Sequence, residues 1–444
     1  MKIKLPSVAG KFYTDDKEKL IKQLELFKQN NLRDYEYRTR AVIVPHAGYV
    51  YSGQLASCGI QYIDNSVKNV FIIAPPHYVP VSDVVLSSYD KWSTPIGEID
   101  VNQGINEELI NNFGCKFDDN AFADEHSAEV QVPFVQKYLP DVKIIPILAA
   151  NPEKIKQIIE HYYENKENAF IISSDLSHFY SSGEAKKLDL LTAELLETKN
   201  TENFNSKLAC GAVGILGLLD FAKDKKYSLI RIGLYNSGDI TGDNSRVVGY
   251  GSWMLYEGER NEFIKKYFSD FIIDICKQSI LTRFEKQDLK LEGIAHVFME
   301  TGASFVTLEK NGDLRGCIGS VIAHRTLVDD LAQNARNSAF SDPRFEPLQK
   351  DEFDELSINV SLLSTPEKMS FKDEQDLLNQ IRPNIDGIII KDKGNQAVYL
   401  PSVWEQLPDK VQFLNSLKIK AGLNPKHFSD TFEAYRYTTE YIKS

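Results

Sequence analysis

Apolar positions in the first part of the chain form short, unbroken runs separated by longer stretches with helical spacing. The runs have the length of strands: residues 41–44, 70–74, 143–148 and 169–173. Unbroken apolarity is typical of strands that are buried on both faces of a sheet. The intervening stretches place apolar residues on one helical face: residues 15–29, 52–63 and 152–164. This alternation predicts an α/β domain with a mostly parallel sheet sandwiched by helices.

The pattern changes near residue 258, where a polar segment is followed by a long helical pattern that starts at Glu262. Beyond that point helices and strands are mixed, without regular alternation. The expected elements are a helix through Arg283, a strand at 303–308, a helix at 327–339, and strands at 356–363 and 387–391. We therefore predict two domains, residues 1–257 and residues 260–444, the second of the α+β class.

Composition restricts the class of protein further. The chain has 444 residues, of which 42% are hydrophobic and 11% aromatic, so it can bury a full core and is not a disordered chain. Its net charge of −12 argues against general nucleic-acid binding, which needs a basic face. The apolar runs are far shorter than the ~20 residues that span a bilayer, and the first residues lack an apolar signal core. We expect a cytoplasmic protein with no nucleic-acid or membrane partner.

The cysteines are scattered rather than grouped. They number five and form no CxxC motif: Cys58, Cys115, Cys210, Cys276 and Cys317. This spacing argues against a zinc ribbon or an iron–sulfur cluster built from this chain alone, and favours reduced thiols. Cys210 begins a loop that enters a helix, and a helix N-terminus stabilises a thiolate, so Cys210 is a candidate ligand or nucleophile. The alternative is a small buried residue that packs the start of that helix.

Histidines and a carboxylate follow three of the predicted strands. His46 lies two residues past the 41–44 run, His77 three past the 70–74 run, and Asp175 and His178 just past the 169–173 run. Carboxyl ends of parallel strands meet at one edge of a sheet, where open α/β folds bind their ligands. The sequence therefore predicts a metal or acid–base site at this edge. The alternative is a set of unrelated surface or capping histidines.

The donor types restrict the metal. Imidazoles combined with a carboxylate or thiolate suit iron, copper or zinc better than magnesium or calcium. His46 and His77 supply two ligands, and the third could come from Asp175, His178, His126 or a cysteine. His126, at the start of the helical segment 124–131, is also a candidate proton carrier or a partner that orients a ligand. The neighbouring Glu125 has an ordinary explanation as a helix cap.

A series of short motifs stands in a fixed order over residues 1–257. It comprises Pro45–Tyr49, Pro76-His77, Glu125–Glu129, Ser174–His178, Cys210-Gly211 and Gly238-Asp239. This series resembles the Memo family. The resemblance implies an α/β fold related to the class III extradiol dioxygenases, and a metal cleft formed by His46, His77 and Cys210 and lined by Asp175 and His178. A thiolate replaces the carboxylate that those dioxygenases use, so ring cleavage does not follow from the fold.

The second domain resembles the AMMECR family through four motifs: Leu314–Gly319, Ser341–Phe345, Leu400–Val403 and Lys420–Leu423. A cysteine that often stands two residues before that lysine is replaced here by Lys418. Within the first motif, Cys317 is flanked by glycines and lies near Arg315, so we consider it a candidate catalytic thiol. The alternative is a structural cysteine at the end of a strand. The segment 342–344 is either an internal ion pair or an anion site.

Memo-like and AMMECR-like domains in one chain resemble the two non-radical components of a three-part system whose third member is a radical-SAM protein. The resemblance thus implies a radical-SAM partner in another chain. We predict a metal-dependent, dioxygenase-like oxidoreductase, with iron as the expected cofactor and copper or zinc as alternatives. It would act on a small molecule or peptide, with His126, Asp175 and His178 as catalytic groups. The alternatives are a copper- or iron-binding redox module and a peptide-binding protein without turnover.

Overall fold

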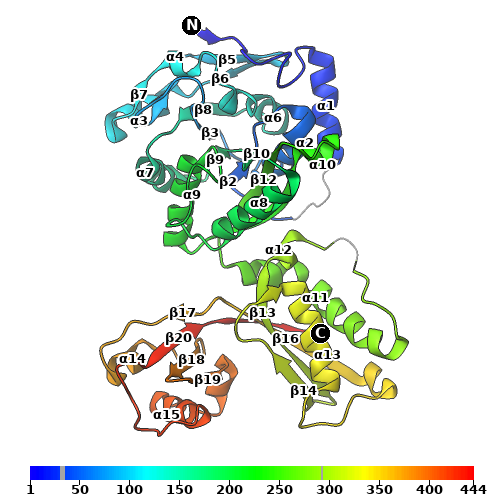
Figure 1. The fold of residues 1–444 in the computed structure, drawn as a ribbon. Helices are drawn as coiled ribbons and strands as arrows, with labels where there is room; N and C mark the ends of the chain where they lie inside the picture. The colour runs from blue at the N-terminus through cyan, green and yellow to red at the C-terminus, as the bar shows by residue number, and fades with distance from the viewer. Residues whose placement is uncertain (31–35, 292–293) are drawn as a thin grey trace. The chain divides into compact units, whose positions relative to one another are not determined.

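The computed structural model describes residues 1–30, 36–291 and 294–444, and the chain forms two compact units (Figure 1). The first unit is Met1–Arg260 and the second is Asn261–Ser444. Each has its own hydrophobic core.

The first unit is built on a nine-stranded mixed sheet with the order β10-β12-β2-β9-β3-β8-β4-β7, and β11 pairs with β12. The strands are β2 (Ala41–Val44), β3 (Asn69–Ala74), β4 (Val85–Leu86), β7 (Lys116–Phe117), β8 (Lys143–Leu148), β9 (Asn168–Ser173), β10 (His178–Tyr180), β11 (Ser228–Asn236) and β12 (Val247–Tyr256). The neighbours β2, β9, β3 and β8 are parallel to one another, as the unbroken apolar runs predict.

The prediction of a mostly parallel sheet is correct for these four strands but wrong for the sheet as a whole. β12 pairs antiparallel with β10, β11 and β2, and β4 pairs antiparallel with β8. β11 and β12 are joined by a short segment, and parallel pairing would require a longer crossover connection. The sheet is therefore parallel at its centre and mixed overall.

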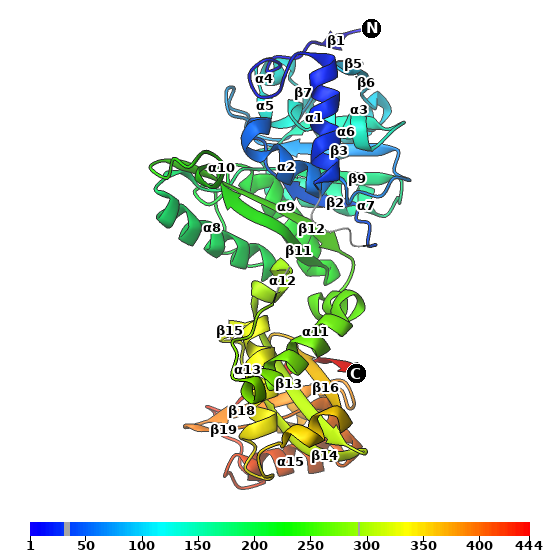
Figure 2. The ribbon, with the colours of Figure 1, turned by 90° about the vertical axis from the view of Figure 1, so that its right-hand side faces the viewer.

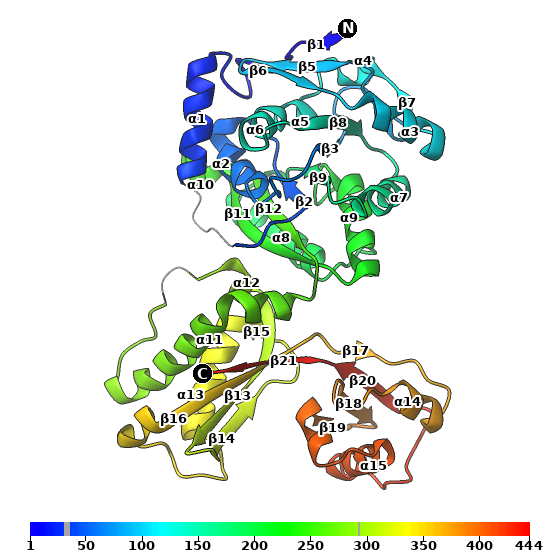
Figure 3. The same ribbon diagram turned by 180° about the vertical axis from the view of Figure 1, so that it is seen from behind.

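Helices cover both faces of this sheet (Figures 1 and 3). On one face α2 (Tyr49–Ile60) packs with α1 (Lys17–Gln29) and α6 (Val132–Tyr138). On the other face α9 (Ala212–Lys225) packs with α7 (Pro152–Tyr163), which also contacts α3 (Gln103–Phe113). The remaining helices are α4 (Asp119–Phe122), α5 (His126–Glu129), α8 (Ser182–Glu197) and α10 (Ser237–Thr241).

Alternate residues of each central strand face opposite helix layers, which explains the continuous apolar runs. A Cβ atom placed on Gly214 of α9 would lie 3.0 Å from Ile172 and 3.1 Å from Ile73, so α9 rests directly on β9 and β3. On the opposite face, a Cβ on Gly59 of α2 would lie 2.5 Å from Val44. The central strands are thereby fixed tightly, and so are the loops that follow their carboxyl ends. A small separate sheet, β1 (Ile3–Lys4), β5 (Lys91–Thr94) and β6 (Gly97–Asp100), completes the unit.

The second unit contains two antiparallel sheets (Figure 2). One comprises β13 (Thr301–Lys310), β14 (Asp313–Gly319), β15 (Arg325–Thr326), β16 (Leu356–Leu363) and β21 (Thr439–Lys443). The other comprises β17 (Glu367–Lys368), β18 (Gly387–Asp392), β19 (Asn395–Tyr399) and β20 (Glu433–Tyr437). The helices are α11 (Arg260–Glu285), α12 (His296–Met299), α13 (Leu327–Phe340), α14 (Glu374–Gln380) and α15 (Lys410–Lys420). This is the predicted α+β class.

Two backbone features of the second unit relate to its sequence. β13 and β14 are joined at Asn311 and Gly312, whose φ angles of 55° and 87° suit a tight hairpin turn. The long helix α11 is interrupted at Phe268, where φ is −140° and ψ is 16°. Among the helices of the described residues, none is both long enough and apolar enough to cross a membrane.

Candidate metal centre

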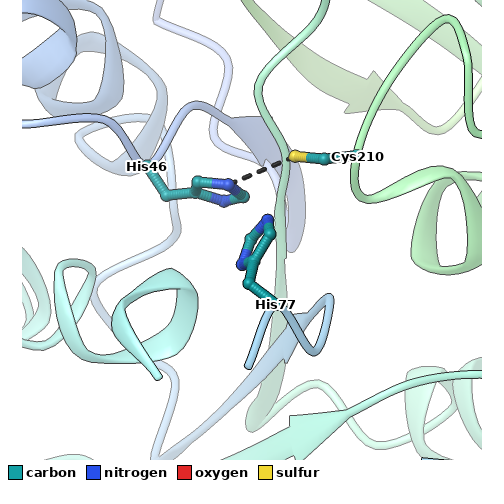
Figure 4. A group of neighbouring side chains, drawn as sticks. All are labelled: His46, His77 and Cys210. Carbon is teal, nitrogen blue, oxygen red and sulfur yellow. Dashed lines mark hydrogen bonds between the residues drawn. The ribbon is translucent and has the colours of Figure 1, made fainter. Parts of the chain in front are cut away.

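Three residues from separate segments meet at the carboxyl edge of the parallel strands (Figure 4). His46 follows β2, His77 follows β3, and Cys210 lies in the loop that precedes α9. One ligand atom of each lies within 4.8 Å of the others, which is a spacing that could hold a metal ion. The convergence arises because β2, β9 and β3 are adjacent and parallel. The structure thus brings together the three residues that we predict as ligands.

The ring of His46 is held in one tautomer by a hydroxyl group. Its Nδ1 lies 2.9 Å from Ser173 Oγ, and Ser173 donates its only hydroxyl proton to the carbonyl oxygen of Ser127 at 2.7 Å. The Ser173 oxygen must therefore accept from the ring, so His46 Nδ1 carries the proton. The lone pair then lies on Nε2, which is 3.2 Å from Cys210 Sγ. His46 is buried, and burial lowers its pKa well below the ordinary value, so the ring is neutral.

A buried carboxylate orients the second imidazole. His77 Nδ1 lies 2.9 Å from Glu125 Oε1, and Glu125 also accepts hydrogen bonds from the amides of His77 and Ser127. A carboxylate only accepts hydrogen bonds, so Nδ1 of His77 carries the proton. The lone pair of His77 therefore lies on Nε2, as in His46, and can bind a metal. Burial alone would raise the pKa of Glu125, but the hydrogen bonds from His77 and Ser127 outweigh it and lower that pKa to about 2. Glu125 therefore both caps α5 and orients His77.

The thiol of Cys210 is protonated in the absence of a metal, contrary to the expectation from its place near a helix N-terminus. Burial raises its pKa, and the neighbouring Asp175 adds to the effect. These effects exceed that of the hydrogen bonds from the amide of Asp175, at 3.3 Å, and from Ser174 and Gly211. A bound cation is the interaction that would favour the thiolate here. Gly211 allows the close approach, since a Cβ atom there would lie 2.5 Å from the carbonyl oxygen of Ser173.

Asp175 lies beside the first ligand and is almost fully buried. Its Oδ1 accepts a hydrogen bond from the backbone amide of His46 at 2.8 Å. Burial raises the pKa of Asp175 to about 7, despite that hydrogen bond. The carboxyl group therefore changes charge near neutral pH, which is the range in which a group can give or take a proton usefully.

His126 and His178 add further imidazoles to the same region. The ring centroid of His126 lies 4.6 Å from that of His77 and 5.4 Å from that of His46. Burial lowers the pKa of His126 to about 4. His178 donates from Nδ1 to the carbonyl oxygen of Leu176 at 2.8 Å, which leaves its Nε2 unprotonated. Its pKa is lowered by burial and by the nearby His77.

A second group of donors shares His77 with the first. His77, Glu125 and His126 also bring ligand atoms within 4.8 Å of one another. However, Oε1 of Glu125 already accepts from His77 Nδ1 and from the amide of Ser127. Glu125 is thus better described as the partner that orients His77 than as a ligand itself.

Several residues that shape the site escape sequence reasoning. Ser173 is the last residue of β9, and its position at a strand end was the only available signal. Glu129 is a second example: it accepts from Lys4 Nζ at 2.8 Å, from Tyr13 Oη at 2.9 Å, and from the amides of Ser7 and Val8. These bonds hold the N-terminal segment 3–13, which places the ring of Phe12 at 4.5 Å from that of His126. They join residues over 110 positions apart, so no local pattern reveals them.

Cys317 lies in the second unit, on β14, and its surroundings favour the structural alternative. Its amide donates to Asp342 Oδ2 at 2.8 Å, and its carbonyl oxygen accepts from Arg344 Nη2 at 3.2 Å. Arg344 also pairs with Asp342 at 2.7 Å, so the segment 342–344 forms an internal ion pair. Asp342 and Arg344 thus provide hydrogen-bond partners for the amide and the carbonyl oxygen of Cys317, which lies on the edge strand β14. The catalytic role of Cys317 stays a prediction.

Lys418 occupies the position where a cysteine is often found, and it is fully buried. Its Nζ donates to Glu374 Oε1 at 2.8 Å and to the carbonyl oxygen of Pro425 at 3.1 Å. Its ammonium group also lies over the rings of Phe428 and Phe432. In this chain the position is therefore structural.

Comparison with known proteins assigns a family to each unit. The family model described as Memo-like protein matches residues 4–254, and the AMMECR1 model matches residues 273–442. A MEMO1 family protein of Aquifex aeolicus is 32% identical over 263 residues, which covers 56% of this chain and 98% of that protein. A MEMO1 family protein of Thermoplasma acidophilum is 32% identical over 260 residues, covering 56% of this chain and 96% of its own length.

Among solved structures, the uncharacterized protein PH0010 from Pyrococcus horikoshii matches with 27% identity and a TM-score of 0.37. The match covers 39% of this chain and 89% of that chain. The Memo-like model spans more than half of the 444 residues, and the relatives are matched over almost their whole length. The chain therefore belongs to the Memo-like family and carries an AMMECR1 domain after its Memo-like domain.

Proposed function

We propose that the first unit is a mononuclear metal centre with oxidoreductase activity, and that iron is its metal. The observation that supports this most directly is the pair of imidazoles locked with Nε2 facing a half-buried thiol. Ser173 and Glu125 each fix one ring, and Cys210 Sγ lies 3.2 Å from His46 Nε2. Histidines that serve only the packing of a core do not need their ring nitrogens fixed by separate partners and directed at one point, whereas metal ligands do.

The donor set fits a transition metal. Two neutral imidazoles and one cysteine are ligands that iron, copper and zinc accept, and His46, His77 and Cys210 would hold the ion. Three ligands leave coordination positions open, so a bound iron would supply a place for a small molecule and a source or sink of single electrons. A thiolate ligand distinguishes this set from two histidines and a carboxylate, and for this reason we propose oxidoreductase chemistry in general and leave ring cleavage out.

The other residues have roles that follow from their own contacts. Asp175 orients His46 through its backbone amide, and its pKa of about 7 lets it hold or release a proton near neutral pH. His178 presents an unprotonated Nε2, which can accept a proton from a substrate. The ring of Phe12 packs against that of His126, whose side chain is only 13% exposed.

The proposed substrate is a small organic molecule or a peptide side chain, and the proposed partner is a radical-SAM protein in another chain.

A specific observation also favours the alternative of a redox module without turnover. Cys210 is half-buried and its neutral thiol contacts His46, so metal loading or loss would be coupled to proton transfer within the pair. Copper would suit this alternative as well as iron.

The proposal is tested by metal analysis of protein purified without oxygen, followed by oxygen consumption in the presence of candidate reductants and substrates. We expect about one equivalent of a transition metal per chain, lost in His46→Ala and Cys210→Ala. The matched controls are His161→Ala and Cys115→Ala, because these residues lie in the same unit but in neither group of donors. Metal below a tenth of an equivalent, or equal content in His46→Ala, would refute the proposal. Normal metal with no oxygen consumption would favour the redox module.

A further inference from the structure

A strained aromatic residue follows His178 directly. β10 pairs with β12 through His178–Val248 and Tyr180–Val247, so Phe179 is the extra residue of a β-bulge. Its φ angle is 65°, in the left-handed region that bulky side chains avoid. The other non-glycine residues with positive φ among the described residues are all Asp, Asn or Lys. Glycine is the residue usually found in such a bulge, so phenylalanine here costs stability.

The packing of the fold does not explain this residue. The side chain of Phe179 is 63% exposed, so little apolar area is buried to offset the strain. Its described ring contacts are His178, at a centroid distance of 5.7 Å, and the guanidinium of Arg246, at 5.1 Å. Strained residues with exposed side chains are characteristic of sites that bind something. The ring is therefore available for an interaction outside the fold.

Arg246 supplies a free positive charge beside this ring. It is exposed, and within residues 1–30, 36–291 and 294–444 no carboxylate lies at ion-pair distance from it. Arginine stacked on an aromatic face keeps its edge donors available for a planar acceptor.

The pair is connected to the metal centre through His178. His178 lies three residues after Asp175, whose carboxylate accepts a hydrogen bond from the backbone amide of His46 at 2.8 Å, and its own Nδ1 is held by the carbonyl oxygen of Leu176. The bulge at Phe179 thus directly follows the segment 175–178 that contacts the first ligand, and Phe179 itself is exposed. A molecule that places its reactive end near His178 would extend its other end over Phe179 and Arg246.

We propose that Phe179 and Arg246 form a recognition rim that selects an organic carboxylate with an aromatic or flat apolar body. The carboxylate pairs with the guanidinium edge and the apolar body stacks on the exposed ring. This inference rests on the proposed function and names the substrate class of the same site. Stacking is the role that requires an aromatic residue at the bulge, where glycine would be more stable.

The test compares benzoate with benzamide, which have the same ring but differ in charge. Binding is measured by isothermal titration calorimetry with the full chain, both metal-loaded and metal-free, at low salt. We expect benzoate to bind about tenfold more tightly than benzamide, the factor expected for one charge-assisted pair. Arg246→Gln should abolish that preference and leave the binding of benzamide unchanged. Phe179→Leu should weaken both probes, because it removes the ring and keeps the strained backbone.

Two further variants separate recognition from structure. Phe179→Gly should weaken both probes while its melting temperature stays equal to or above that of the wild type, because glycine adopts a φ of 65° without strain. The controls are Lys143→Gln and Phe117→Leu, an exposed cation at the amino end of β8 and an exposed aromatic of β7, which should change neither probe.

Equal binding of the two probes in the wild type, or an unchanged preference in Arg246→Gln, would overturn the inference. Metal content in these variants should equal that of the wild type. A failure of the proposed function would instead appear as absent metal in the wild type, with the benzoate preference intact. The two ideas can therefore fail separately.

Discussion

Replacing Glu125 by Gln tests whether the metal centre depends on the partner that orients its ligand. Glu125 is fully buried, and its carboxylate lies 2.9 Å from His77 Nδ1. Glutamine has nearly the same shape and can keep one acceptor oxygen, but it loses the charge that makes the imidazole a stronger donor to a metal. Loss of such a partner lowers metal affinity by about 10- to 100-fold, or about 1.4–2.8 kcal/mol.

The measurement is a competitive titration with a chromophoric chelator, using Co²⁺ or Zn²⁺ at pH 7. Glu129→Gln is the matched control, because Glu129 is an equally buried carboxylate four residues further along that binds Lys4 instead of a histidine. We expect Glu129→Gln to destabilise the fold but to keep its metal affinity within about threefold of the wild type. Equal affinities in the two variants, or no change in Glu125→Gln, would refute the reasoning.

Stability must be separated from affinity in this comparison. The folded pKa of Glu125 is about 2, below the ordinary value of 4.5, so its ionised form stabilises the fold above pH 4.5. That contribution is lost as the pH falls through about 2. The Gln variant should therefore be less stable than the wild type at pH 7, and the difference should shrink in acid. Affinities are compared only on protein that circular dichroism shows to be folded.

Two other substitutions give distinct outcomes. Asp175→Asn in the metal-free protein should remove a decline in the free energy of unfolding between about pH 4 and 7. Burial raises the folded pKa of Asp175 from 3.8 to about 7, so the protonated form is the one that stabilises the fold. Urea unfolding at several pH values measures this decline, and parallel curves for wild type and variant would contradict the prediction. Gly316→Ala should destabilise the second unit by about 1–3 kcal/mol, because a Cβ there would lie 2.1 Å from the carbonyl oxygen of Ser338. Thermal unfolding tests this against Gly183→Ala, where nothing lies within 4 Å, and equal effects would contradict it.

The sequence by itself determined the central strands and the residues at their carboxyl ends. A strand covered on both faces must be apolar at every position, so the four runs were visible without any structure. Parallel neighbours bring their ends to one edge, and this rule is enough to group His46, His77 and Asp175. Cys210 has no such rule, because its loop precedes a helix. The helix entry made it a candidate ligand, and the family motifs grouped it with His46 and His77.

Tertiary structure alone decided how these groups are protonated and held. The tautomer of His46 depends on Ser173, which is 127 residues away, and that of His77 on Glu125, which is 48 residues away. The helix entry near Cys210 favours a thiolate, but burial has the larger effect and keeps the thiol protonated. Burial also places the pKa of Asp175 near neutrality. Desolvation depends on every group packed around a site, and no local pattern in the sequence records that sum.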